Sequence, residues 1–292
     1  MRLIHITDPH LTSLAHWRPG LRAGKRWLSW LSWQTGRRRR HRRERLDSLT
    51  TALAAKQPDA WAITGDLCQI GLDAEAAEAR DWLNRLASPE RTLLVPGNHD
   101  VFARDSDGPI RRRWADYLHV DPDSPQWPVT RRFEDLVLIG LNSAIVTPPL
   151  RAGGRLGADM RRRLVECLRA HRGRCRVVLI HHPPLPNTCK PRKALSDDAE
   201  LTEILRQHGP ALVLHGHLHR NREWALADGA AGMTRVFCTA SASASGKQGA
   251  AAGRMFDIRA GKNGFEIEMR LMLLDAGGRV HEAEHQQWET TG

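Results

Sequence analysis

The sequence predicts an α/β fold in which a largely parallel sheet is flanked by helices, with a basic, tryptophan-rich insertion after the first strand. Two observations carry this prediction. Short apolar runs alternate with segments of helical periodicity through the first 95 residues, a pattern typical of strand–helix–strand units. Positive charge is concentrated in residues 18–45, which interrupt this alternation just after its first strand.

The N-terminal elements follow each other in that order. Pro58 ends the first helix after the insertion, and Pro96 ends the third apolar run, because proline cannot continue either element. We expect strands at residues 3–7, 60–64 and 92–95, and helices at residues 46–56 and 73–86.

The remaining elements continue this pattern and then change character. We expect a β pair at 131–133 and 136–141, helices at 158–171 and 198–207, and strands at 176–180 and 211–214. Short apolar runs at 223–226, 234–239, 255–258 and 265–274 predict a second, mostly antiparallel sheet. Residues 240–253 are small and polar, which predicts a mobile loop.

The composition excludes several classes of protein. Of the 292 residues, 41% are hydrophobic and 26% charged, which excludes wholesale disorder. No apolar run approaches the 18 residues of a spanning helix. His5, Asp8 and His10 interrupt the first apolar run, which argues against a secretory signal. The five cysteines are scattered, odd in number and never spaced C-x-x-C, as expected for reduced thiols in a cytoplasmic protein.

The insertion carries nearly all of the net charge. Residues 18–45 hold eleven arginines and lysines against one glutamate, so they contribute +10 of the formal +11. They also hold three of the ten tryptophans, and a fourth, Trp17, directly precedes them. Trp27, Trp30 and Leu31 stand at helical spacing, so this segment predicts a basic amphipathic helix.

Three interpretations of the insertion remain open. Tryptophan beside arginine is typical of a bilayer interface, where the ring lies at headgroup depth and the guanidinium meets lipid phosphate. A nucleic-acid patch and a solvated charge run beside a helix packed on the core are the alternatives. The candidate contacts with substrate or membrane are Trp27, Trp30, Trp33, Arg37, Arg38, Arg39 and Arg40.

Five polar motifs each follow the end of an apolar strand. Because the carboxyl ends of parallel strands meet at one sheet edge, we expect these motifs to lie close together. Histidine nitrogens with aspartate or asparagine oxygens suit transition metals, and one carboxylate can bridge two cations about 3.5–4 Å apart. The motifs are Asp8-Pro9-His10, Gly65-Asp66, Gly97-Asn98-His99-Asp100, His181-His182-Pro183-Pro184 and Gly216-His217-Leu218-His219.

This ordered set resembles the calcineurin-like metallophosphoesterase superfamily. The resemblance covers residues 1 to about 220, and the insertion at 18–45 lies outside the shared pattern. It implies a four-layer αββα metallophosphoesterase sandwich that spans residues 1–292 as a single domain. The C-terminal strands would then complete the second sheet rather than form a separate domain.

Carried over residue by residue, the resemblance implies two metal ions that share Asp66. One ion would be held by Asp8, His10, Asp66 and His219, and the other by Asp66, Asn98, His181 and His217. The candidate catalytic residues are His99, beside the scissile phosphate, and Asp100, which would orient it. His182 would support the ligands from behind, while His5 and His215 would be structural.

The resemblance also implies the chemistry. The expected enzyme is a metal-dependent phosphohydrolase that cleaves a phosphodiester or pyrophosphate bond by in-line attack of a metal-bridged hydroxide. Its expected cofactors are two divalent or transition-metal ions, with manganese the first choice and iron, zinc or cobalt as alternatives. Its expected partner is a phosphate-ester substrate.

The insertion is the clue to the substrate, because it follows the first metal motif directly and can form a lid or wall there. The tryptophans and arginines of the insertion indicate a substrate with an acyl tail and an anionic head. Such a substrate is similar to UDP-diacylglucosamine, which one branch of the family cleaves in lipid A synthesis. We therefore expect a cytoplasmic protein, peripheral on the inner face of the cytoplasmic membrane. The alternatives are a soluble cyclic-nucleotide or glycerophosphodiester phosphodiesterase, a nuclease that binds nucleic acid, and a non-catalytic membrane adaptor. No pattern indicates an oligomeric state.

Overall fold

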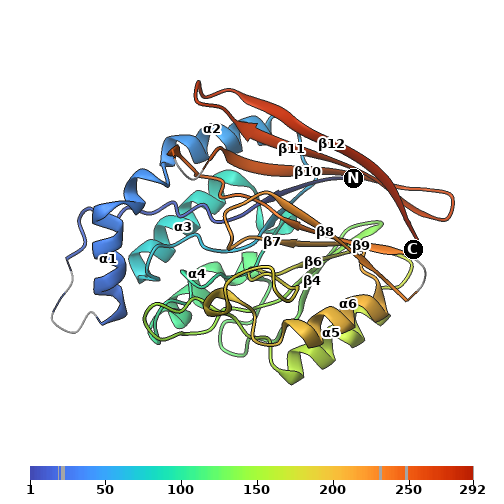
Figure 1. The fold of residues 1–292 in the computed structure, drawn as a ribbon, viewed down its shortest axis with the longest axis horizontal. Coiled ribbons are helices and arrows are strands. Elements are labelled where there is room, and N and C mark those ends of the chain that lie inside the picture. The colour runs from blue at the N-terminus through green and yellow to red at the C-terminus, as the bar shows by residue number, and fades with distance from the viewer. Residues whose placement is uncertain (19, 21–23, 230–231, 247–248, 292) are drawn as a thin grey trace.

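The fold contains two six-stranded sheets in a computed structural model that describes residues 1–18, 20, 24–229, 232–246 and 249–291 (Figure 1). The first sheet has the order β12-β11-β10-β1-β2-β3. Strands β1, β2 and β3 are parallel, while β10, β11 and β12 are antiparallel additions beside β1. Their bounds are β1 Arg2–Ile6, β2 Ala60–Ile63, β3 Thr92–Leu94, β10 Ala251–Ala260, β11 Gly264–Leu274 and β12 Val280–Thr291.

The second sheet has the order β4-β5-β6-β7-β9-β8. Its four central strands are parallel and its two edge strands, β4 and β8, are antiparallel. Their bounds are β4 Val129–Arg132, β5 Leu136–Gly140, β6 Cys175–Leu179, β7 Leu212–His215, β8 Arg222–Ala227 and β9 Met233–Cys238.

Helices cover the outer face of each sheet, which gives the four layers that the resemblance implies (Figure 1). Helices α2, α3 and α4 lie on the first sheet, and α5 and α6 lie on the second. The bounds are α1 Lys25–Thr35, α2 Arg43–Ala54, α3 Asp73–Leu86, α4 Asp107–Leu118, α5 Ala158–Ala170 and α6 Asp198–His208, with 3₁₀ turns η1 Arg37–Arg39, η2 Pro89–Arg91 and η3 Pro191–Lys193.

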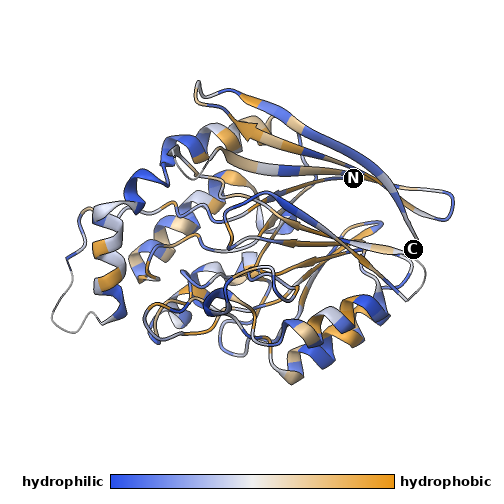
Figure 2. Cartoon of the chain, in the orientation of Figure 1, coloured by the Kyte–Doolittle hydropathy of each residue, from blue (hydrophilic) through white to orange (hydrophobic). Residues whose placement is uncertain are grey.

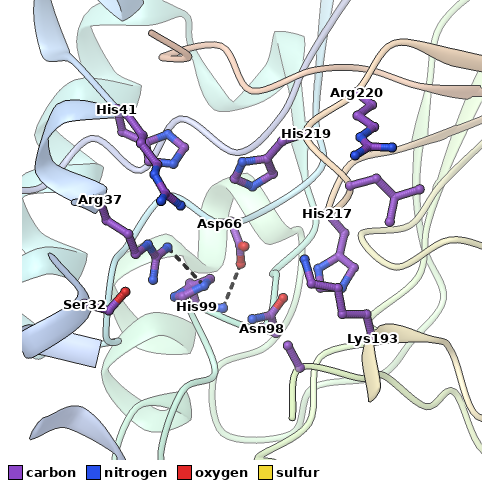
Figure 3. Close-up of a pocket in the computed structure, with 13 residues that line it drawn as sticks. Ser32, Arg37, His41, Asp66, Asn98, His99, Lys193, His217, His219 and Arg220 are labelled. Atoms are coloured by element: carbon purple, nitrogen blue, oxygen red, sulfur yellow. Dashed lines mark hydrogen bonds between the residues drawn. The ribbon is translucent and has the colours of Figure 1, made fainter. Parts of the chain in front are cut away.

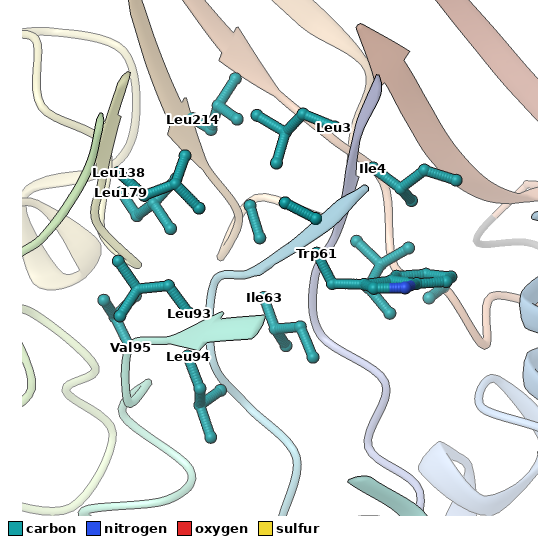
Figure 4. Packing of buried hydrophobic residues seen from close by; sticks show 14 of the residues in the cluster. Leu3, Ile4, Trp61, Ile63, Leu93, Leu94, Val95, Leu138, Leu179 and Leu214 are labelled. Carbon is teal, nitrogen blue, oxygen red and sulfur yellow. The ribbon is translucent and has the colours of Figure 1, made fainter. Parts of the chain in front are cut away.

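The central strands are continuous apolar runs in the sequence because both of their faces are buried in the core. Leu3 and Leu93 of the first sheet share one buried cluster with Leu138, Leu179 and Leu214 of the second (Figure 4). The alternate residues of the second sheet are buried against α5 and α6 in another cluster. Strands buried on both faces are apolar throughout, and the hydropathy colouring shows these apolar central strands beneath more polar helices (Figure 2).

The C-terminal strands correct two expectations. They do not form one second sheet of their own, nor do they complete only the second sheet. β8 and β9 extend the second sheet, whereas β10 pairs with β1 and brings β11 and β12 into the first. Residues 240–253 are also not one loose loop, because residues 251–253 belong to β10 and Ala240, Ala242 and Ala244 are buried. Residues 247 and 248 of that stretch lie outside the described residues.

Within the described residues, one strand and one α-helix were not predicted. Strand β12 is polar and charged along its length, so it lacks the apolar alternation that indicates a strand. Helix α4 buries Ile110, Trp114, Tyr117 and Leu118 on one face. Its three consecutive arginines obscured that helical spacing.

The insertion folds as α1 and η1, and its last residues begin α2. Residues 19 and 21–23 of the insertion lie outside the described residues. Trp33, only 7% exposed, packs with Leu14, Ile70 and Phe102 in a small separate cluster, and the half-buried Trp30 packs against it. The ring of Trp33 therefore anchors α1, although it also lines a hollow beside Arg38 and Arg39, and its expected contact with substrate or membrane stays a prediction. Among the described residues, no helix combines the length and apolarity needed to cross a bilayer.

Candidate metal centre

The loops that follow five strands meet at one edge of the two sheets. β1 leads to Asp8 and His10, β2 to Asp66, β3 to Asn98, β6 to His181, and β7 to His217 and His219. Backbone hydrogen bonds tie these loops together, since the amide of Asp8 donates to the Gly65 carbonyl (3.0 Å) and that of His10 to the Asp66 carbonyl (2.9 Å). The structure thus brings all seven expected ligand residues together, and Figure 3 shows several of them around one pocket.

Four of these residues form a first cluster. Asp8, His10, Asp66 and His219 each place one ligand atom within 4.8 Å of the others. His10 Nε2 lies 3.4 Å from His219 Nε2 and 3.8 Å from Asp66 Oδ2. His219 Nε2 lies 3.0 Å from Asp8 Oδ1. Ligand atoms about 2.1 Å from a shared cation are about 3 Å apart, so this cluster can hold one ion.

A second cluster surrounds His181 Nε2. It lies 3.2 Å from Asn98 Oδ1, 3.2 Å from His217 Nδ1 and 3.4 Å from Asp66 Oδ2. Asp66 Oδ2 therefore lies between the two clusters, while Asp66 Oδ1 accepts a hydrogen bond from the His99 amide at 2.7 Å. This is the placement that a bridging carboxylate requires.

Hydrogen bonds behind the ligands set their tautomers. Nδ1 of His181 lies 2.7 Å from the Thr64 carbonyl, and Nδ1 of His10 lies 3.1 Å from the Cys68 carbonyl. Only an N–H can bond to a carbonyl, so Nδ1 carries the proton in both rings. Nε2 then presents its lone pair to the cluster, as a metal ligand must.

The backbone at this edge is strained. Five of the seven expected ligand residues have positive φ, a conformation that is uncommon outside glycine and clusters at functional sites. Gly216 is needed for a different reason, because a Cβ there would collide with the Thr7 hydroxyl and the Asp8 carboxylate. The strained residues are Asp8 (50°), His10 (40°), Asp66 (58°), His217 (68°) and His219 (52°).

The electrostatics of the edge also suit cations. Burial, together with the charges of Asp8 and Asp100, raises the pKa of Asp66 well above its ordinary value. Burial also lowers the pKa of His10 and His217, which keeps these imidazoles neutral and able to bind metal. Three buried carboxylates in close contact are stabilised by added positive charge, so the donor set fits two metal ions.

Comparison with known proteins decides the family. A family model described as calcineurin-like phosphoesterase matches residues 1–221. The chain belongs to the calcineurin-like phosphoesterase family. The match confirms the resemblance of the five motifs and ends where those motifs end.

One curated protein is similar to this calcineurin-like phosphoesterase at low identity. A protein named "Probable cyclic nucleotide phosphodiesterase" from Synechococcus sp. (strain ATCC 27144 / PCC 6301 / SAUG 1402/1) is 28% identical over 171 residues, which are 58% of this chain and 60% of that protein. The chain therefore spans about 60% of the length of this curated relative.

Two solved structures share the fold. Purple acid phosphatase from yellow lupin (Lupinus luteus) seeds matches 99% of this chain and 53% of its own with a TM-score of 0.59 and 10% identity. The sulfate thiohydrolase of Thermus thermophilus matches 97% of this chain and 58% of its own with a TM-score of 0.57 and 18% identity. At these identities the likeness shows the fold alone.

The role expected for Asp100 in the phosphoesterase site needs correction. Its carboxylate accepts backbone hydrogen bonds from Asp66 (2.8 Å), Gly97 (2.9 Å) and Cys68 (2.9 Å). Within the described parts of the chain, it makes no hydrogen bond to the His99 ring. Asp100 therefore positions the loops that carry Asp66 and Asn98. Burial raises its pKa to about 6 even though it accepts these bonds.

The His99 ring is held by two other groups. Its Nδ1 lies 2.6 Å from the Gln69 carbonyl, so this nitrogen carries the proton. Its Nε2 accepts a hydrogen bond from Arg37 at 3.1 Å (Figure 3). Burial and the nearby Arg37 charge lower the pKa of His99 well below its ordinary value. The insertion thus reaches the centre of the site.

The other expected residues divide between the site and its surroundings. Arg37 and Arg40 line the pocket that contains Asp66, whereas the exposed Arg38 and Arg39 line a neighbouring hollow. Trp27 is 46% exposed on α1.

Three further histidines lie in the interior. His182 contacts the Ser143 hydroxyl at 2.8 Å and packs behind His217. His5 lies between the hydroxyls of Thr64 and Thr239, and His215 is stacked on Trp224. These placements agree with a supporting role for His182 and with structural roles for His5 and His215.

The pocket also contains residues that sequence reasoning missed. Its volume is about 500 Å³, and Lys193, Arg220 and His41 line it together with the expected ligands. Arg220 directly follows the last metal motif, and that adjacency was a usable signal. Lys193 and His41 come from a 3₁₀ turn and from the insertion, and no pattern in the sequence aims either residue at the site.

Proposed function

We propose that the protein is a metal-dependent hydrolase that cleaves a phosphodiester or pyrophosphate bond. The carrying observation is that two clusters of ligand atoms share Asp66 Oδ2. Two ions bound there would lower the pKa of water and offset charge on phosphoryl oxygens. Manganese is our first choice, with iron, zinc or cobalt as alternatives. One ion is assigned to Asp8, His10, Asp66 and His219, and the other to Asp66, Asn98, His181 and His217.

The chain's own polar groups complete the proposed mechanism. Arg37 supplies fixed positive charge beside His99, so we assign it to a phosphoryl oxygen, whose developing charge its guanidinium stabilises. His99 is neutral with its proton on Nδ1. Its Nε2, which accepts a hydrogen bond from Arg37 in this structure, takes a proton from solvent water and passes it to the leaving oxygen, so that the ring returns to its neutral form. Asp100 keeps the loops of Asp66 and Asn98 in place.

The substrate that we favour is amphiphilic, with an acyl tail beside its phosphate, such as UDP-diacylglucosamine at the inner membrane face. Helix α1 supports this choice because it exposes Trp27, Leu28 and Leu31 to solvent, while Ser32 at its end lines the pocket. One short element therefore joins an exposed apolar surface to the cavity where the phosphate would bind.

A cyclic nucleotide is the second candidate substrate. The observation that favours it is the 28% identity to the Synechococcus protein named as a probable phosphodiesterase of this kind. A cyclic nucleotide has no acyl chain, so its turnover would not depend on the exposed face of α1. The two candidates therefore differ in a property that can be measured.

The hydrolase assignment is tested by metal analysis of the purified protein, coupled to assays with phosphomonoesters, diesters and pyrophosphates. We expect two ions per chain and hydrolysis that is lost on chelation. Asp66→Asn should lose both ions and turnover while keeping its circular dichroism spectrum. Wild-type turnover in this variant would show that the site has been misplaced.

The substrate is tested with the variant Leu28→Ser/Leu31→Ser, which removes exposed apolar surface from α1 without changing its charge. Our proposal predicts that kcat/KM falls for an acylated nucleotide sugar but not for a small chromogenic diester. If the variant and wild type hydrolyse the acylated substrate at equal rates, and both hydrolyse cyclic AMP efficiently, the cyclic-nucleotide alternative is favoured instead.

A further inference from the structure

His41 brings a histidine from the insertion to the first metal cluster. It lies between η1 and α2, outside the five family motifs, and its ring is buried. The ring centroid is 4.4 Å from that of His10 and 5.2 Å from that of His219. One nitrogen from each of these three rings lies within 4.8 Å of the other two. Figure 3 shows His41 beside His219 at the rim of the pocket.

The orientation of the His41 ring is fixed from the side opposite the cluster. Its Nδ1 lies 3.0 Å from the Ser243 hydroxyl and 3.2 Å from the Ser241 hydroxyl. Ser241 in turn donates to the backbone carbonyl of Asp8 at 2.6 Å. Since the serines bond to Nδ1, Nε2 is the nitrogen that is available to a cation.

The backbone around His41 is fixed as well. The Arg42 amide donates to the Ser243 carbonyl at 3.0 Å, and the Ser245 amide donates to the Arg40 carbonyl at 2.8 Å. His41 itself pairs with Ala244 in an isolated β-bridge. This part of the insertion is therefore attached to the same loop that supports Asp8, which places the imidazole reproducibly.

We propose that His41 is a fifth protein ligand of the first metal ion, bound through Nε2, so that the ion links the insertion to the core. The inference rests on the proposed function, because it requires the ion held by Asp8, His10, Asp66 and His219. Octahedral coordination offers six positions, so His41 leaves one of them for water or substrate. Because the ion would link the insertion to the core, docking of the insertion and metal binding would stabilise each other.

Metal titrations test this assignment without relying on turnover. Wild type, His41→Ala and His41→Gln are titrated with Mn²⁺ and Co²⁺ against a competing chelator, with circular dichroism to verify folding. The control is His16→Ala, because His16 is an exposed histidine in the same N-terminal segment. We expect both His41 variants to bind one of two ions at least about tenfold more weakly. The affinity of both variants for the other ion should be unchanged, and the control should bind both ions as tightly as wild type.

Two further measurements distinguish a His41 that binds the metal from a His41 that only packs against the site. The d–d absorption of the Co²⁺-loaded protein should change in His41→Ala and return when free imidazole is added. Hydrogen exchange in residues 36–45 should slow on metal loading in wild type but not in His41→Ala.

The outcomes also separate this inference from the proposed function. A wild-type protein that binds two ions, with His41 variants that match it in affinity and spectrum, would overturn the inference alone. A wild-type protein that binds no metal would overturn both.

Discussion

At the residue scale, His5 illustrates how the fold keeps an imidazole neutral away from the metal centre. It is fully buried between Thr64 and Thr239, whose hydroxyls bond to both ring nitrogens. Burial and the nearby charge of Arg254 lower its pKa to about 3. In the unfolded chain the pKa of an imidazole is about 6.5. The two states therefore bind different numbers of protons at mildly acidic pH.

This difference predicts how the free energy of unfolding depends on pH. Well above pH 6.5 the imidazole is neutral in both states, so the contribution of His5 is complete. Between about pH 6.5 and 3 only the unfolded chain gains the proton, so stability falls by about 1.4 kcal/mol per pH unit as the pH decreases. His5→Asn can keep a polar contact with Thr239, which lies at the Nδ1 side of the ring, but it lacks this titration. We expect it to be less stable than wild type at pH 7.5 and the difference to narrow at pH 6 and 5.

Urea unfolding at these three pH values, with a chelator present to exclude metal effects, measures that difference. All other buried histidines are common to both proteins, so their titrations cancel. A stability difference that stays constant from pH 7.5 to 5 would contradict the buried, neutral state of His5.

At the scale of elements, the sequence predicted what local pattern determines. Each apolar strand and the polar motif after it lie within a few residues of each other, so Asp8, Asp66, Asn98 and His217 could be assigned to one sheet edge in advance. The pairing of β10 with β1 joins residues about 250 apart and leaves no local trace. The same reason applies to His41, because long-range packing alone aims its ring at the site. Arg37 was expected to contact substrate or membrane, but only the fold distinguishes it from Arg38 and Arg39, which line a neighbouring hollow.

Helix α1 offers a matched pair of tryptophans that separates packing from surface contact. Trp33 is 7% exposed and Trp27 is 46% exposed. We expect Trp33→Ala to lower the free energy of unfolding by about 3 kcal/mol, because it leaves a cavity against Ile70 and Phe102. Trp27→Ala should change stability by less than about 0.5 kcal/mol yet reduce binding to anionic vesicles. Chemical denaturation and vesicle co-sedimentation measure the two effects.

The reverse pattern would show that α1 packs differently. If Trp27→Ala destabilises the protein while Trp33→Ala does not, the two faces of the helix have been exchanged. If neither variant affects vesicle binding, the exposed face of α1 does not contact lipid.

At the scale of the whole molecule, charge is separated in space as well as in sequence. Residues 18–45 carry +10 of the net +11, and α1 lies at one end of the molecule, far from α5 and α6 (Figure 1). Near an anionic membrane each exposed arginine contributes about 1 kcal/mol, and this attraction decays within a Debye length of about 8 Å at physiological salt. At such a surface this attraction would favour an orientation with the insertion toward the lipid, as the proposed amphiphilic substrate requires.

This asymmetry predicts that equal charge changes have unequal effects. Arg38→Gln/Arg39→Gln removes two exposed charges beside the pocket, and we expect about 30-fold weaker binding to anionic vesicles at low salt, with a smaller effect at high salt. The control, Arg162→Gln/Arg169→Gln, removes the same charge from α5 and should bind as wild type. Both should hydrolyse a small diester at wild-type rate, since neither changes Arg37.

Equal losses of vesicle binding in the two variants would mean that net charge alone attracts the protein. Unchanged vesicle binding with weakened binding of single-stranded DNA would favour the nucleic-acid interpretation of the insertion instead.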